Sequence, residues 1–221
     1  MQFPNAAKGV KKIHTAEILD LLSSLFLLIT AILAIVTAAS ASAESAGGAI
    51  VGGLGFVLFG IAALVLGVIA FFMQLSGINT AKLDEPLFKN ALIALIIGIV
   101  LQVVSGSSLL PDGLVKELCG SLGYACDMLV TIYIVQGIGA LAEKLANQEL
   151  VAKCKSLVKL LETVWIVAVV LKAVGGVLAK VGTASEIVIA VIGAAAVVAS
   201  IVAYIIFLGL LKKGKAMLEA A

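Results

Sequence analysis

The segment from Tyr133 to Glu162 changes from apolar to lysine-rich and back to apolar, and it reads YIVQGIGALAEKLANQELVAKCKSLVKLLE. A long apolar run leads into this segment and another follows it. Positive residues concentrate in the connectors of membrane proteins, while the runs between them cross the lipid. We therefore interpret Tyr133–Glu162 as a polar connector that joins two membrane spans.

The composition supports the same interpretation for the whole chain. Of its 221 residues, 62% are hydrophobic and only 13% are charged, whereas ordinary globular proteins are roughly 45–50% apolar. A soluble domain must cover its outside with polar groups, and this chain has too few of them. We expect an all-α, polytopic membrane protein whose residues 1–221 form a single integral membrane domain.

Six apolar runs are long enough to cross a bilayer, since a membrane helix needs about 20 residues. They occupy about 16–39, 48–75, 87–110, 118–141, 157–179 and 186–211. Short polar segments separate them. The sequence thus predicts six transmembrane helices arranged as three helical hairpins.

The lysines predict the orientation of these spans. All fifteen basic residues are lysine, and twelve of them lie in the N-terminal arm, the connectors after the second and fourth spans, and the C-terminal tail. The opposite turns hold only Lys116 and Lys180, and Lys172 lies inside the fifth span. Because positive residues favour the cytoplasmic side, we expect both termini in the cytoplasm and the protein in the plasma membrane.

Four glycines recur at similar spacing, each followed by an apolar residue and a short lysine-bearing segment: Gly9, Gly77, Gly137 and Gly209. Their spacing favours an internal repeat of three hairpins, an arrangement common in transporters, whose sites lie between repeats. Any series of apolar hairpins with lysine on one side also produces this pattern. Both interpretations stay open.

Three polar side chains fall well inside the predicted spans: Gln102, Asp127 and Lys172. Counted at 1.5 Å per residue from the outer span ends, they lie at similar depths of roughly 12–14 Å. Polar and charged groups at membrane depth usually face a bundle interior or a water-filled cavity. We expect a solute or ion site there, with Tyr124 and Thr37 as further members.

Three arrangements of this cluster are compatible with the sequence. In the first, the cluster is an outward-open site for a small polar solute, an ion or a proton. In the second, Asp127 and Lys172 form a closed ion pair that fixes helix packing. In the third, the long side chain of Lys172 reaches outward to the headgroups.

The sequence argues against several other functions. It has no paired carboxylates at a fixed spacing, no serine or cysteine beside a base, and no group of metal ligands, so we expect no enzyme, no catalytic residues, no metal and no cofactor. His14 is the only histidine. Arginine, the usual residue for phosphate recognition, is absent, which argues against nucleic-acid binding.

Two functional hypotheses follow. The first is a small secondary transporter or channel for a small polar solute or ion. The alternative is a non-transporting membrane protein that organises partners or lipids. The expected partners are the lipid bilayer and either a second copy of the chain or another membrane subunit.

Overall fold

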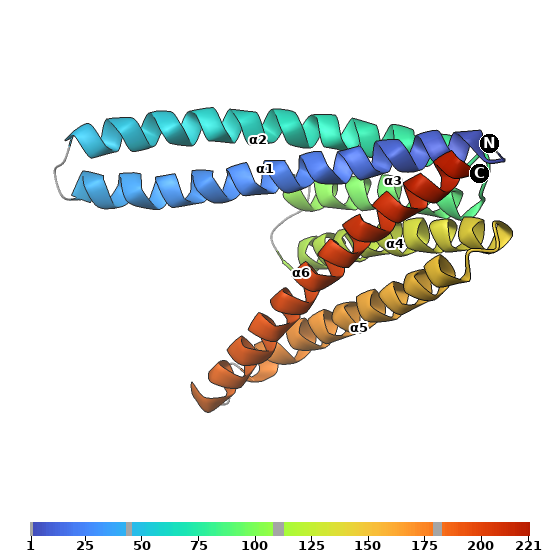
Figure 1. Cartoon of the computed structure of the whole chain (residues 1–221). Helices are drawn as coiled ribbons and strands as arrows, with labels where there is room; N and C mark the ends of the chain where they lie inside the picture. Colours follow the sequence, from blue (N-terminus) through green and yellow to red (C-terminus); the bar gives the residue numbers. More distant parts are fainter. Residues whose placement is uncertain (1, 43–45, 108–112, 179–182) are drawn as a thin grey trace. The chain divides into compact units, whose positions relative to one another are not determined.

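The computed structural model is all-helical (Figure 1). It describes residues 2–42, 46–107, 113–178 and 183–221, with side chains for 2–38, 53–107, 113, 115–167 and 195–221. These ranges contain six helices and no strand: α1 (Pro4–Ser42), α2 (Ala46–Ala81), α3 (Leu87–Gly106), α4 (Leu114–Lys144), α5 (Gln148–Leu178) and α6 (Thr183–Ala220). The expectation of an all-α protein is confirmed.

Five of these helices are long and apolar enough to cross a membrane: α1, α2, α3, α4 and α6. The sixth predicted span, 157–179, belongs to α5, most of whose apolar half lies outside the described side chains. In α1 the helix begins at Pro4, twelve residues before the predicted span. The lysine-rich N-terminal segment is therefore the first part of the helix that continues into the span.

Large apolar side chains cover the outside of the first two helices. Only 11% of the most apolar window of α1, and the same share of α2, is buried. Ile35 is 70% exposed, Leu58 68% and Leu64 67%. Water would penalise such a surface, whereas lipid tails accept it. These exposed helices indicate an integral membrane protein.

The chain divides into two compact units. The small unit, Lys11–Gly77, holds most of α1 and α2. The hydroxyl of Ser23 donates a hydrogen bond to the Ala63 carbonyl at 2.8 Å, and the rings of Phe26 and Phe59 meet edge to face with centroids 5.6 Å apart. Since the later residue of α1 meets the earlier residue of α2, the two helices are antiparallel.

The large unit comprises Met1–Val10 and Ile78–Ala221. Its α3 and α4 are also antiparallel, and glycines in α4 admit side chains of α3. A Cβ at Gly137 would lie 2.8 Å from the ring of Phe88, and a Cβ at Gly120 would lie 2.8 Å from the hydroxyl of Ser105. Phe88 is fully buried. The absence of a side chain at Gly137 thus creates the place that the Phe88 ring fills.

A tight turn joins α4 to α5 at Leu145–Asn147. The Asn147 N–H donates to the Ala142 carbonyl at 2.8 Å and the Ala146 N–H to the Glu143 carbonyl at 3.0 Å, which is the Schellman pattern of a helix C-terminus. The side-chain oxygen of Asn147 then accepts the Leu150 N–H at 3.1 Å and caps α5. The connector is therefore made by extensions of α4 and α5 themselves.

The fully buried side chains of the large unit gather at this turn and at the other lysine-rich segments. They include Ile78, Phe88, Ile134, Ile138, Leu141, Leu157, Leu211 and Leu218. Both chain termini lie at this end as well (Figure 1). The best-packed core thus lies beside the lysines, while the apolar middles of the helices remain exposed.

Ala146 provides a test of the α4–α5 turn, because it has a φ of 55°, in the left-handed region that favours glycine. We expect Ala146→Gly to raise the free energy of unfolding by about 1 kcal/mol, since the left-handed conformation penalises the Cβ. Ala152→Gly, at an exposed position inside α5, should lower it by a similar amount. Thermal unfolding of the purified proteins in detergent measures both. Equal loss of stability in the two variants would contradict the turn geometry.

Candidate functional site

The predicted site lies at a close backbone approach of α3 and α4, at Gly98 and Gly123. A Cβ at Gly123 would lie 2.9 Å from Cγ of Gln102 and 3.4 Å from the Gly98 carbonyl. A Cβ at Gly98 would lie 3.0 Å from Cβ of Cys126 and 3.3 Å from the carboxylate of Asp127. Only residues without side chains permit such close backbone contact, as is common between membrane helices.

Gln102 and Asp127 are brought together beside this crossing. The Gln102 amide donates a hydrogen bond from Nε2 to Oδ2 of Asp127 at 2.5 Å. Both side chains are exposed, although both belong to helices apolar enough to span a membrane. One amide satisfies only part of a carboxylate, which can accept about four hydrogen bonds. The carboxylate therefore retains the capacity to bind a cation, a proton or a polar solute.

The other predicted site residues occupy different environments. Tyr124 lies on α4 three residues before Asp127, and its side chain is 70% exposed. Lys172 belongs to α5, but its side chain lies outside the described residues. The structure thus joins Gln102 to Asp127 directly and does not describe the third polar group of the predicted cluster.

Thr37 belongs to the small unit. Its hydroxyl donates a hydrogen bond to the Leu33 carbonyl at 2.7 Å, within α1. Together with Phe56 and three small residues of α1 and α2 it lines a cavity of about 310 Å³. A threonine whose hydroxyl bonds to its own helix backbone satisfies its donor locally.

A second polar cluster, which the sequence did not single out, lies at the lysine-rich end of the large unit. Its first element is Asp84, in the connector between α2 and α3. Oδ1 of Asp84 accepts a hydrogen bond from the Asn5 amide at 2.9 Å, and Oδ2 accepts the Ala6 N–H at 2.8 Å. The first N–H groups of a helix have no intrahelical partner and carry partial positive charge. Asp84 therefore caps α1 from another segment of the chain.

The next residue, Glu85, extends this cluster to the end of α4. Its side chain is only 7% exposed and accepts a hydrogen bond from Lys144 at 2.6 Å. The same ammonium lies 5.8 Å from the centroid of the Phe3 ring, within the range of a cation–π contact. Three segments that are distant in sequence thus meet at one ion pair.

The sequence contained one signal for this cluster: Asp84 and Glu85 are adjacent acids in a connector that otherwise carries lysine. Their partners lie 79 and 59 residues away along the chain. No local pattern identifies partners at such separation.

No known protein family, curated protein or solved structure matches this chain.

The crossing of α3 and α4 is tested by Gly98→Ala, with Gly106→Ala as its control on the same helix. The added methyl at Gly98 meets Cys126 and the Asp127 carboxylate, whereas nothing lies within 4 Å of a Cβ at Gly106. We expect Gly98→Ala to lower the free energy of unfolding by about 1–3 kcal/mol through overpacking, and Gly106→Ala to leave it unchanged or slightly raised. Thermal unfolding in detergent distinguishes them. A Gly98→Ala variant as stable as the control would contradict the close approach.

Proposed function

We propose that this protein is a small secondary transporter or channel that moves a small polar solute or an ion, and that Asp127 and Gln102 form part of its site. The observation that carries the proposal is the hydrogen bond between Gln102 and Asp127 on exposed positions of two spanning helices. An exposed carboxylate is costly in hydrocarbon. That cost is removed where the carboxylate faces a water-filled path between helices, because water solvates the charge.

The chemistry of the pair fits a cation or a proton better than an anion. Asp127 offers carboxylate oxygens, and Gln102 offers one amide that orients them. Tyr124 adds a phenolic hydroxyl one helical turn away. In this proposal Lys172 contributes a positive charge at a similar depth and balances Asp127 when the site is empty, and Thr37 is the equivalent residue of the first hairpin.

The proposal includes the arrangement of the spans. Six spans form three helical hairpins related by an internal repeat, with both termini in the cytoplasm of a cell whose plasma membrane holds the protein. The first support is that twelve of the fifteen lysines fall in the segments predicted to lie on one side. The second is that both chain ends lie at the same end of the large unit as the α4–α5 turn (Figure 1). One feature departs from a strict repeat: Gly137 contacts Phe88, whereas nothing lies within 4 Å of a Cβ at Gly209.

The alternative is a non-transporting membrane protein that organises partners or lipids, with a second copy of the chain or another membrane subunit as its partner. One observation favours it: the Asp127 carboxylate lies 3.3 Å from where a Cβ at Gly98 would be, so it borders a closely packed crossing. A polar pair in that place can serve to fix the register of α3 against α4.

Ion movement distinguishes the two functions. The purified protein is reconstituted into liposomes that contain a pH-sensitive dye, and a potassium gradient with valinomycin drives proton entry. We expect wild-type protein to acidify the lumen and Asp127→Asn to reduce the rate to that of protein-free liposomes, because the amide cannot exchange a proton. The same vesicles are tested for sodium uptake.

Glu117→Gln is the matched control, since Glu117 is an exposed carboxylate nearer the start of α4. It should behave as the wild type. If Asp127→Asn folds, inserts and conducts protons and sodium as fast as the wild type, or if the wild type conducts neither, the proposed site is wrong and the organising role is favoured.

The orientation is tested with single cysteines in a background where Cys119, Cys126 and Cys154 are replaced by serine. A membrane-impermeant maleimide added to intact cells should label a cysteine at Gly113 and not one at Lys11, because the lysine-rich side faces the cytoplasm. In inside-out vesicles the labelling should reverse. Labelling of Lys11→Cys on intact cells would contradict cytoplasmic termini.

A further inference from the structure

A cleft of about 440 Å³ lies between α4 and α5, close to the turn that joins them. Its floor is mostly apolar and consists of Gly139, Ala140, Val151, Cys154 and Val158, with the uncharged amide of Gln136 beside them. The two helices approach closely here, because a Cβ at Gly139 would lie 3.2 Å from Cβ of Cys154. Burial raises the pKa of the Cys154 thiol to about 11, so the floor carries no charge at neutral pH.

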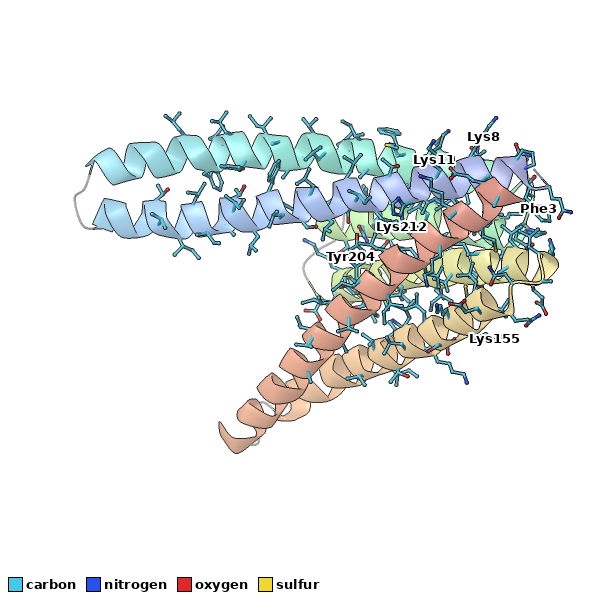
Figure 2. All side chains as sticks on the ribbon, viewed as in Figure 1. Phe3, Lys8, Lys11, Lys155, Tyr204 and Lys212 are labelled. Atoms are coloured by element: carbon cyan, nitrogen blue, oxygen red, sulfur yellow. The ribbon has the colours of Figure 1, made fainter. Side chains whose placement is uncertain are left out.

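The rim of the cleft carries two lysines. Lys155 and Lys159 are four residues apart on α5, so they extend from the same face of the helix. Neither makes an ion pair with any described residue, whereas the neighbouring Lys153 pairs with Glu149. Figure 2 shows the side chain of Lys155 extending away from α5. Two like charges at this spacing repel each other until an anion lies between them.

Two carboxylates limit which anions fit. Glu143 lies on the rim toward the turn, and Glu162 lies on the rim one helical turn beyond Lys159. Their negative charges repel anions that carry charge along their whole length, so a ligand with one localised phosphate is favoured over a polyanion. The apolar floor in turn favours a ligand with a hydrocarbon part.

The position of the cleft matches the interface of a membrane. It opens on the lysine-rich end of the large unit, and Lys155 lies just before the predicted start of the fifth span at 157. The charged residues of the cleft balance, with two lysines and two glutamates, so any affinity for an anion comes from the local pair Lys155 and Lys159. Lysines beside a cleft between membrane helices at this level can bind the phosphate of a phospholipid headgroup. The long lysine side chains can reach the phosphates while their stems cover apolar surface.

We propose that this cleft binds one membrane phospholipid, with its phosphate between Lys155 and Lys159 and an acyl chain along the floor. Binding here is independent of the proposed solute path at Asp127, which lies several turns away along α4. A bound lipid fills the space between α4 and α5 and neutralises the repulsion between the two lysines.

The experiment measures phospholipid binding by native mass spectrometry after delipidation and addition of phosphatidylglycerol in detergent. The double variant Lys155→Gln/Lys159→Gln removes the phosphate ligands. The control Lys8→Gln/Lys11→Gln removes two exposed lysines from α1, where Figure 2 shows them. We expect wild type and control to bind one lipid with equal affinity, and the double variant to bind it roughly tenfold more weakly or worse, as for lost charge-assisted hydrogen bonds. Equal affinity in all three proteins would overturn the proposal.

A second variant tests the acyl chain without changing charge. Ala140→Phe fills the floor and should weaken phosphatidylglycerol binding while leaving the melting temperature of lipid-free protein within the range of the control. Inorganic phosphate at millimolar concentration should not displace the lipid. If inorganic phosphate displaces the lipid and Ala140→Phe binds lipid normally, the cleft binds anions without holding an acyl chain, and the lipid assignment is wrong. Neither the lysine variant nor Ala140→Phe changes Asp127, so both should conduct protons or sodium as the wild type does. A failure of the lipid proposal is therefore distinguishable from a failure of the proposed transport function.

Discussion

Lipid supplies no hydrophobic force that draws apolar helices together, and this constraint explains where the chain is packed and where it is open. Inside the bilayer, helices associate through close backbone approach and through polar pairs. Gly98 and Gly123 provide the close backbone approach, and the hydrogen bond between Gln102 and Asp127 provides the polar pair. At the lysine-rich end, where water is present, burial of Ile138, Leu141 and their neighbours again stabilises the fold.

Glycines in α4 serve different purposes along the helix and against two different neighbours. Near the predicted site, Gly123 permits backbone contact with α3. Nearer the lysine-rich end, Gly137 accepts the ring of Phe88 and Gly139 accepts Cys154 of α5. The helix α4 can therefore contact both α3 and α5 closely at positions that carry no side chain, whereas its contact with α6 uses Ile138, which lies against Gly214.

Much of the architecture followed from the sequence, because helical membrane spans depend on local hydrophobicity. The predicted span 87–110 begins at the first residue of α3, and counting residues placed Gln102 and Asp127 at similar depth. What the sequence did not reveal depends on partners far apart in the chain. In the sequence Asp84 and Glu85 are two acidic residues of a connector, and only the structure shows that Asn5 and Lys144 bind them. The left-handed Ala146 was equally hidden, since glycine is the usual signal for that conformation.

The cap that Asp84 gives to α1 has a consequence for biosynthesis. The first turn of α1 is synthesised before α2, and its Ala6 N–H can meet the Asp84 carboxylate only after 78 further residues have been added. The ion pair between Glu85 and Lys144 can form only after another 59 residues have been added. The first turn of α1 is thus capped only after α2 has been made, and the connector between α2 and α3 is joined to α4 only later, so these two contacts form in a fixed temporal order.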